Sequence, residues 1–316
     1  MLLTTNNNMK PFKSIIEFQK HFNTDEKCRL YLEEQRWGGT PACPHCGSVN
    51  VCRFKTDVKI FKCRDCRKKF SATVGTVYQD RKLPLHKIFL AVYILSTHSK
   101  GISSLQLANF LDISQKAAWL LNHKVRKMLT EKDPQALDGM IQVDETYIGQ
   151  RFKNKHSKVR KAMRETSSSH DYKTPVMGLL SAGKVLTFVV PKATREHVLP
   201  LLIENIVPQS VLHTDSSHIY TPLKNIFKHS SVNHTRNEYV RREGTALIHT
   251  NGIENFWSLL KRQINGIHHF VSPKHLQRYC NEAAFRFNNK TVTQDVRFAN
   301  ALQNCEGTLQ WKELVK

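Results

Sequence analysis

The residues best suited to chemistry lie in the segment HTNGIENFWSLLKR, at 249–262. At 3.6 residues per turn, Asn251, Glu254, Ser258 and Lys261 share one face of a helix. A helix that presents a carboxylate and, two turns later, a lysine can hold a metal ion and a phosphate together. The segment is therefore a candidate site for chemistry on a phosphate group.

Two aspartates stand upstream, in apolar segments with the pattern of strands. Asp144 lies in MIQVDETYIG and Asp215 lies in SVLHTDSSHIY. Mg²⁺ prefers carboxylate oxygens, and two divalent ions can activate an attacking oxygen and stabilise a leaving one. Two Asp, one Glu and a trailing Lys on a very basic chain therefore indicate metal-dependent phosphoryl transfer on DNA.

Each of these carboxylates also has an ordinary structural interpretation. Asp215 precedes two serines and could cap a helix, and Glu254 could be an i,i+4 ion-pair partner on a helix surface. Glu145 is a further carboxylate next to Asp144, but it is not expected to share the same site. Strand alternation places it on the opposite face of the sheet. The joint arrangement favours catalysis over these separate interpretations.

The composition favours a polyanionic partner. The chain has 316 residues, with 48 Lys and Arg against 26 Asp and Glu, and a formal net charge of +22. Such an excess is typical of nucleic-acid binding, although a surface tuned for solubility has the same sign. No apolar run approaches the roughly 18 residues of a membrane span, and the N-terminus shows no secretory signal. We therefore expect a cytoplasmic protein without a membrane partner, associated with the nucleoid when bound to DNA.

The eight cysteines predict a metal site rather than a disulfide framework. Two CxxC pairs offer four thiolates to one tetrahedral, structural Zn²⁺. The predicted ligands are Cys43, Cys46, Cys63 and Cys66. Four unliganded thiols or a redox pair are the alternatives, but both pairs lie in turn-rich, basic sequence. The basic residues around them suit phosphate contact or a solvated rim. They are Arg53, Lys55, Lys59, Lys62, Arg64, Arg67, Lys68 and Lys69.

A helix-turn-helix candidate follows at residues 103–128, where a short helix, a three-residue turn and a longer helix succeed one another. On the second helix we expect Lys116, Asn122, His123 and Lys127 to point away from the core and toward a DNA groove. A generic helical hairpin shares this pattern. The total charge and the neighbouring ribbon favour DNA binding.

Taken together, the motifs resemble those of the bacterial insertion-sequence DDE transposases of the zinc-ribbon branch, the insertion sequence fifteen-ninety-five family. The motifs are CPxCG, CxxC, FSxTxGT, VDETYIG, TDSSxxY, HTNGIENFWSLLKR and a closing FRFN. Residues 43–76 resemble the family's ribbon, and residues 140–288 resemble its catalytic domain. The resemblance covers most of the chain.

The resemblance implies an α+β, multi-domain protein whose catalytic domain is RNase H-like (integrase-type), with a mixed five-stranded sheet flanked by helices. It implies binding to terminal inverted repeats, cleavage at transposon ends and strand transfer, with two Mg²⁺ or Mn²⁺ ions. Asp144 and Asp215 become the catalytic aspartates and Glu254 the glutamate, followed by Lys261. The branch has Asn or Glu in the third position, so Asn251 is an alternative or an auxiliary ligand.

Five parts are expected along the chain. They are an N-terminal helical segment at 1–40, the zinc ribbon at 41–80, the helix-turn-helix-like module at 81–132, the catalytic domain at 138–300 and a C-terminal tail at 301–316.

The expected partner is double-stranded DNA, at transposon ends and at the target, with no small-molecule substrate. Lys261 and Arg262 are expected to contact this DNA. Because transposition joins two ends, we also expect at least a homodimer on DNA.

Two other functions remain open at this point. A catalytically inactive or domesticated DNA-binding protein would share the ribbon and the helical module. A structure-specific nuclease on the same fold would cut DNA without joining it. The intact carboxylates speak against the first alternative, and the recognition modules speak against the second.

Overall fold

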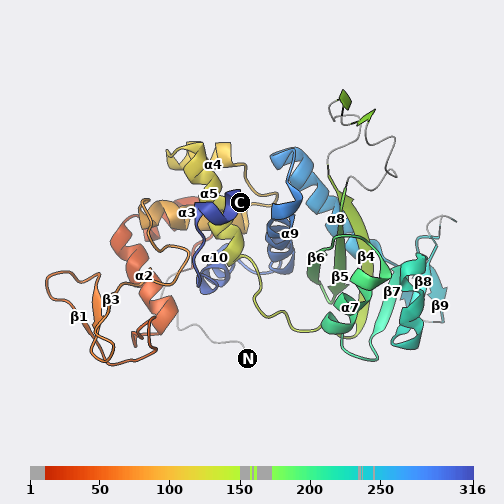
Figure 1. The fold of residues 1–316 in the computed structure, drawn as a ribbon, viewed down its shortest axis with the longest axis horizontal. Coiled ribbons are helices and arrows are strands. Elements are labelled where there is room, and N and C mark those ends of the chain that lie inside the picture. The colour runs from red at the N-terminus through yellow and green to blue at the C-terminus, as the bar shows by residue number, and fades with distance from the viewer. Residues whose placement is uncertain are drawn as a thin grey trace. The chain divides into compact units, whose positions relative to one another are not determined.

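The structure, a computed structural model, describes residues 11–149, 157–158, 160–161, 173–233, 236, 238–244 and 246–316. The chain divides into two compact units (Figure 1). The first consists of Met1–His98, Ser104–Leu129 and Thr291–Lys316, and the second consists of Ser99–Ser103 and Thr130–Lys290. None of the described helices has the length and apolar character that crossing a membrane requires.

The first unit is mainly helical. Its helices are α1 (Ile15–His21), α2 (Asp25–Trp37), α3 (Leu85–Thr97), α4 (Ser104–Leu111), α5 (Gln115–Met128), α10 (Gln294–Gln303) and α11 (Trp311–Val315). The hydroxyls of Ser14, Thr24 and Ser114 cap α1, α2 and α5 by accepting hydrogen bonds from backbone N–H groups. Phe18 of α1 meets Phe298 of α10 edge to face, with ring centroids 5.1 Å apart. The helices α1 and α10, which are far apart in sequence, therefore share one aromatic core.

The helix α10 belongs to this first unit and not to the unit that precedes it in sequence. It packs on α2, α3 and α5, and its Phe298 is fully buried. The predicted boundary at residue 300 falls inside α10, whereas the second unit ends at Lys290. The sequence of an amphipathic helix shows which face is apolar, but it does not show which core that face packs against.

The ribbon of the first unit is a small antiparallel sheet. Its strands are β1 (Val51–Arg53), β2 (Phe61–Cys63) and β3 (Lys69–Phe70), in the order β1-β2-β3. Phe61 and Phe70 are stacked with centroids 5.4 Å apart, and Trp37 at the end of α2 packs on the ring of Phe61 at 5.2 Å. A sheet this short buries too little apolar surface to be stable alone. A bound metal ion would supply the missing stability.

The second unit is built on a mixed five-stranded sheet with strand order β6-β5-β4-β7-β8. Its strands are β4 (Met140–Ile148), β5 (Thr174–Ser181), β6 (Lys184–Val189), β7 (Val211–Asp215) and β8 (Lys228–Val232). β5 is antiparallel to β4 and β6, whereas β7 is parallel to β4 and β8. A separate hairpin, β9 (Arg241–Glu243) and β10 (Ala246–Ile248), precedes the last helices of this unit.

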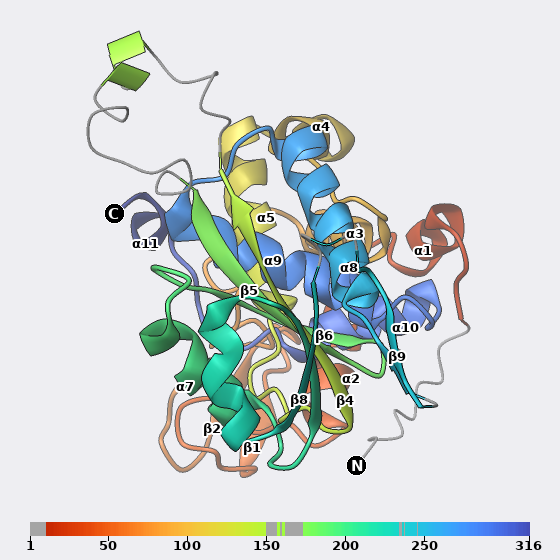
Figure 2. The ribbon, with the colours of Figure 1, turned by 90° about the vertical axis from the view of Figure 1, so that its right-hand side faces the viewer.

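Helices cover both faces of the five-stranded sheet (Figure 2). One face packs on α8 (Asn251–Gln263), which continues into the π-helical turn η4 (Ile264–His268), and on α9 (Pro273–Asn288). The other face packs on α7 (Arg195–Asn205) and the 3-10 helix η2 (His218–Asn225). The predicted fold class, with a ribbon, a helical module and a mixed sheet flanked by helices, is confirmed.

Candidate active site and zinc centre

Asp144 and Asp215 lie on neighbouring parallel strands. β4 pairs with β7 in a register that places Gln142 beside His213. Asp144 and Asp215 each follow this last pair by two residues, so side-chain alternation directs both carboxylates to the same face of the sheet. The carboxylates are close enough for the charge of Asp215 to raise the pKa of Asp144. Strand pairing therefore brings the two predicted aspartates together.

The carboxyl of Asp144 lies in surroundings that disfavour its charge. Burial is the main cause, and the negative charges of Glu145 and Asp215 add to it, so the pKa of Asp144 is raised to about 7. The indole N–H of Trp257 donates a hydrogen bond to Asp144 Oδ2 at 3.0 Å, which acts in the opposite direction. A cation placed between the carboxylates would offset this repulsion.

The helix α8 brings Glu254 to the cleft that contains Asp144. This cleft has a volume of about 880 Å³. Its lining includes Asp144, Glu145, Glu254, Trp257, Lys261 and Arg262. Thr250, at the start of α8, donates a hydrogen bond from its hydroxyl to Glu254 Oε1 at 2.8 Å. Asp215 is not part of the described lining, although its charge reaches Asp144.

Asn251 has a different position from Glu254. It is the first residue of α8, it is exposed, and it is not part of the described lining of the cleft. Glu254, one helical turn later, lines the cleft. The glutamate, and not the asparagine, therefore lines the same cleft as Asp144.

The three carboxylates lie farther apart than the ligands of one ion. Among the described residues, only the four ribbon cysteines bring three or more possible ligand atoms within 4.8 Å of one another. Asp144, Asp215 and Glu254 do not form such a group. Their oxygens are the donors that Mg²⁺ and Mn²⁺ prefer, so the donor set fits these ions.

Trp257 reaches Asp144 because the strand beside Asp144 has no side chain at the crossing point. Gly178 of β5 is paired directly with Asp144. A Cβ at Gly178 would meet Trp257 Cζ2 at 2.5 Å and Ile253 Cδ1 at 2.8 Å. The sequence analysis missed Trp257, although it follows Glu254 by three residues and so shares its helix face.

A second close approach fixes the start of α8 on β4. A Cβ at Gly252 would meet Gln142 Oε1 at 2.7 Å. The same Gln142 oxygen accepts the backbone N–H of Ile253 at 3.0 Å, and its Nε2 lies 3.4 Å from His249 Nδ1. Gln142 therefore satisfies an N–H group of the first turn of α8 and sets the position of the helix.

Glu145 lies on the opposite face of β4 from Asp144, as strand alternation predicts. Its Oε2 accepts a hydrogen bond from the hydroxyl of Tyr220 in η2, whereas Asp144 contacts Trp257 of α8. Burial raises the pKa of Glu145 and that of the Tyr220 hydroxyl. Glu145 borders the cleft, but its carboxylate has a partner on the far side of the sheet.

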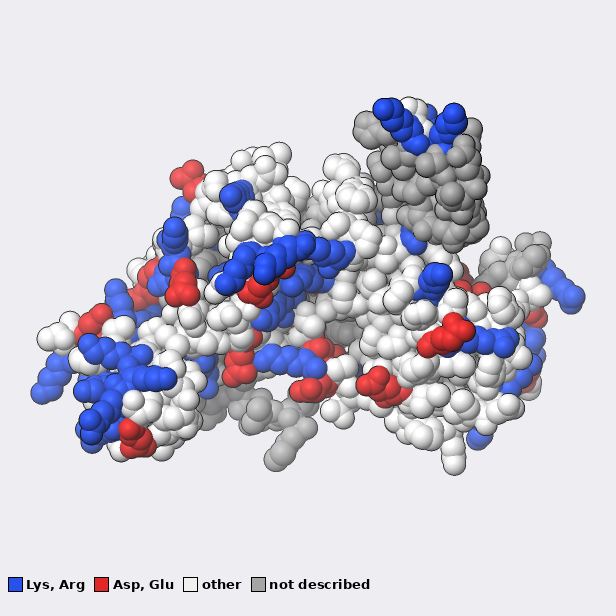
Figure 3. Space-filling model, viewed as in Figure 1, with Lys and Arg blue, Asp and Glu red and all other residues white. Residues whose placement is uncertain are grey.

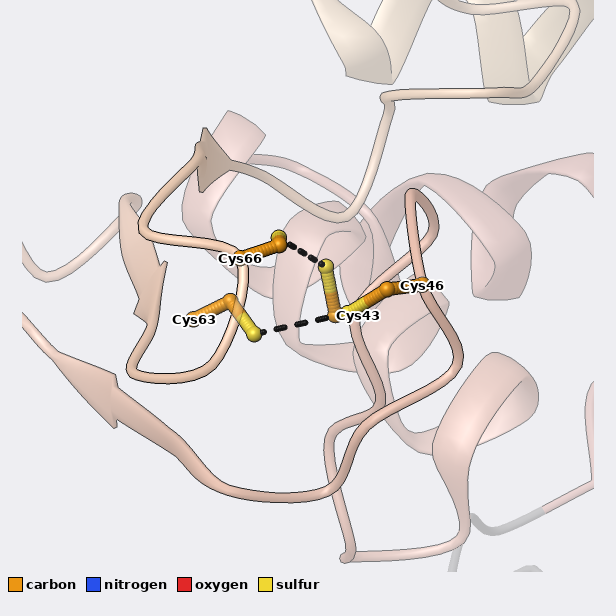
Figure 4. Close-up of side chains that lie close together, drawn as sticks. All are labelled: Cys43, Cys46, Cys63 and Cys66. Atoms are coloured by element: carbon orange, nitrogen blue, oxygen red, sulfur yellow. Dashed lines mark hydrogen bonds between the residues drawn. The ribbon is translucent and has the colours of Figure 1, made fainter.

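The four predicted zinc ligands converge in the ribbon (Figure 4). Cys43 Sγ lies 3.7 Å from Cys66 Sγ, and Cys46 Sγ lies 3.6 Å from Cys63 Sγ. Zn–S bonds of about 2.3 Å in a tetrahedron place the sulfurs about 3.8 Å apart, so the cluster fits structural zinc. The backbone N–H of Cys66 is the main cause that lowers the pKa of Cys63 to about 7, whereas the pKa of Cys46 is raised to about 12, because the backbone N–H of Ser48 is outweighed by desolvation and the thiol neighbours of Cys46.

The ribbon also carries a basic surface (Figure 3). All eight basic residues singled out in its sequence are exposed. We call Arg53, Lys55, Lys59, Lys62, Arg64, Arg67, Lys68 and Lys69 the ribbon cations. An exposed cluster of this density suits the phosphates of a nucleic acid.

Two of the residues predicted to face a DNA groove from α5 are buried. Asn122 is 1% exposed and His123 is fully buried, so the prediction that they point outward is wrong. The helix α5 packs on α3 and α4 and also on α10, which gives it more buried faces than a two-helix hairpin has. His123 contacts the ring of Trp119 at 4.4 Å, one turn earlier on α5.

The two lysines predicted on α5 contact the C-terminal segment. Lys116 is exposed, and its Nζ lies 4.7 Å from the ring centroid of Trp311. Lys127 is half-buried and donates a hydrogen bond to the carbonyl of Thr308 at 2.6 Å. Of the four residues predicted on this helix, Lys116 alone is exposed.

Two regions of this chain match known protein families. Residues 136–288 match the ISXO2-like transposase domain, and residues 23–69 match the transposase zinc-ribbon domain. An uncharacterized protein in the transposable element ISH50 of Halobacterium salinarum is 28% identical over 272 residues, which are 82% of this chain and 90% of that protein. An uncharacterized transposase-like protein of Haemophilus influenzae is 32% identical over 124 residues, which are 38% of this chain and 93% of that protein. The chain therefore belongs to the insertion-sequence transposases that combine a zinc ribbon with an ISXO2-like transposase domain.

Proposed function

We propose that this transposase is an active DDE enzyme that cleaves DNA at the ends of its insertion sequence and joins them to target DNA. The observation that carries the proposal is the alignment of Asp144 and Asp215 on parallel strands, beside a cleft lined by Glu254 and Lys261. Two Mg²⁺ or Mn²⁺ ions, when bound, would activate the attacking oxygen and stabilise the leaving one.

Each residue of the cleft has a proposed role. Asp144, Asp215 and Glu254 hold the ions, and Lys261 and Arg262 bind phosphates of the DNA strand. We assign the third ligand position to Glu254, because Asn251 is exposed and outside the described lining of the cleft. A charged carboxylate is also a better ligand for a hard cation than a neutral amide.

Recognition of the terminal inverted repeats is assigned to the first unit. The ribbon cations supply phosphate contacts, and Lys116 is the one of the four residues predicted on α5 that is exposed. Asn122 and His123 are buried and have no place in this interface. Because two ends have to be joined in one reaction, we expect at least two copies of the chain on DNA.

A strand-transfer assay tests this function. The purified protein, Mg²⁺ and a labelled duplex with the flanking element end would be compared with Asp215→Asn and with a matched control, Glu204→Gln, at an exposed position of α7. Joined products that vanish with Asp215→Asn and persist with Glu204→Gln would support the proposal. Cutting without joining would indicate a structure-specific nuclease. Tight, salt-sensitive binding with neither product would indicate a catalytically inactive DNA-binding protein.

A further inference from the structure

The segment Ser99–Ser103 joins α3 to α4 along the chain, yet it belongs to the second compact unit. Gly101 and Ile102 in its middle are buried. Gly101 has φ +81°, a left-handed conformation that favours glycine. A Cβ at this position would meet Glu282 Oε1 at 2.7 Å and the Nη1 and Nη2 atoms of Arg286 at 3.6 Å. The backbone of the segment therefore lies directly on two charged side chains of α9.

These two side chains form a buried ion pair beneath residues Ser99–Ser103. Glu282 and Arg286 are an i,i+4 ion pair whose side chains are 0% and 7% exposed. Arg286 also donates a hydrogen bond to Gln263 Oε1 at 2.7 Å, which ties the pair to the last turn of α8. A buried pair with further hydrogen bonds has little freedom to rearrange, so the surface on which Gly101 lies is fixed.

Lys100, next to Gly101, lines the same cleft as Asp144, Glu254 and Lys261. It is exposed, and among the described residues no carboxylate pairs with it. Its neighbour Gly101 lies against α9, and Lys100 approaches the cleft from a different element than Lys261 and Arg262 of α8. The cleft thus has cations from two separate parts of the chain.

We propose that Lys100 is a phosphate-binding residue of the active-site cleft, where it holds the DNA strand independently of α8. The inference rests on the proposed function, because it takes the DNA strand to be the occupant of the cleft. The cleft also contains the carboxylates of Asp144 and Glu254, which repel an anionic strand. Additional cations that are not metal ligands reduce that repulsion and give the strand a defined path.

Binding of a pre-cut element end tests the proposal without requiring any chemistry. The full chain would be titrated with the labelled duplex in Mg²⁺, over a range of salt concentrations, by fluorescence anisotropy. Loss of one phosphate contact in Lys100→Ala should weaken binding several-fold and reduce the slope of log Kd against log salt by about one. Lys192→Ala, at an exposed position between β6 and α7, is the matched control and should change neither quantity.

Neutral methylphosphonates, placed singly along the cleaved strand, identify the phosphate that Lys100 contacts. One position near the cut should weaken binding to the wild type and to Lys192→Ala but have no further effect on Lys100→Ala. Gly101→Ala, which would displace the segment, should reproduce the loss, and Lys100→Arg should restore binding. The inference is overturned if Lys100→Ala behaves like Lys192→Ala at every position. If the wild type binds as described but fails in the strand-transfer assay, the proposed function fails instead.

Discussion

Burial and two neighbouring carboxylates raise the pKa of Asp144. The hydrogen bond from Trp257 lowers this pKa, but by less than burial and the carboxylates raise it. Its pKa is about 7 in the folded protein against the ordinary value of 3.8. For an acid whose pKa rises on folding, the folded state loses stability as pH increases from the unfolded pKa to the folded one. The loss is complete above about pH 7, so this side chain destabilises the protein at neutral pH unless a cation is bound.

Replacing this carboxylate should therefore stabilise the protein. In buffer without divalent ions, Asp144→Asn should raise the free energy of unfolding by about 1–4 kcal/mol at pH 8, with a gain that grows between about pH 4 and pH 7 and is level at higher pH. Denaturant unfolding at several pH values measures it. Asp133→Asn, at an exposed position, is the control. A gain that shrinks with rising pH, or one that Asp133→Asn matches, would contradict this account of Asp144.

Trp257 should act as a positioning residue for Asp144. Trp257→Phe keeps an aromatic ring but removes the donor, and the loss of one hydrogen bond to a charged group should reduce Mg²⁺-dependent cleavage about tenfold. Gly178→Ala should have a similar effect by displacing the ring. Single-turnover cleavage at varied Mg²⁺ measures both, with Trp311→Phe as the matched control. An unchanged Mg²⁺ dependence in Trp257→Phe would show that the hydrogen bond is only structural.

Candidate site residues can be predicted from the sequence where their type and spacing are distinctive. The residues that position them cannot be predicted in this way. Asp144, Glu254 and the four cysteines are conspicuous in the chain without any knowledge of the fold. Gly178 matters only because β5 pairs with β4 in the register that places it beside Asp144. Such a relation depends on strands that are far apart in sequence, and no local pattern contains it.

Among the elements, the ribbon depends most directly on one group of side chains. Its three strands are short, and its small core contains Cys43 and Cys63 beside Phe61 and Phe70. Thiolate ligands therefore contribute both to the metal site and to the packing. Without the metal, the remaining apolar contacts are too few to hold the ribbon.

Loss of one zinc ligand should unfold the ribbon without unfolding the second unit. In Cys63→Ser the ribbon should lose zinc, and limited proteolysis should cut within residues 43–70. Cys52→Ser is the matched control, because Cys52 lies on β1 of the same ribbon outside the four-cysteine cluster. Zinc content and peptide mapping measure the difference. Equal zinc content and equal resistance in the two variants would contradict the assignment of Cys63 as a ligand.

The helix α5 shows where prediction from a single element fails. Its apolar positions fit a two-helix hairpin, and that picture leaves Asn122 and His123 outside. In the structure α10 also packs on α5, although it lies about 170 residues later in the chain. The burial of a helix face depends on such distant partners, which the periodicity of the helix itself does not contain.

In the whole molecule, the net charge of +22 is unevenly distributed. The ribbon cations are exposed and clustered, whereas the cleft mixes carboxylates with Lys100, Lys261 and Arg262. We therefore expect the ribbon to supply much of the salt-dependent affinity for DNA and the cleft to supply the chemistry. The fold class of both units could be predicted from the motifs, but the return of the C-terminal helices to the first unit could not.

Counting bound Mn²⁺ tests most directly whether the aligned aspartates form a metal centre. The zinc-loaded protein with a bound element end would be titrated with Mn²⁺, and the free ion would be measured by electron paramagnetic resonance. The wild type should bind about two ions per chain at the cleft. Asp144→Asn and Asp215→Asn should each lose at least one of them, while Glu204→Gln should keep both. Equal Mn²⁺ binding by the wild type and both aspartate variants would contradict the proposed catalytic site.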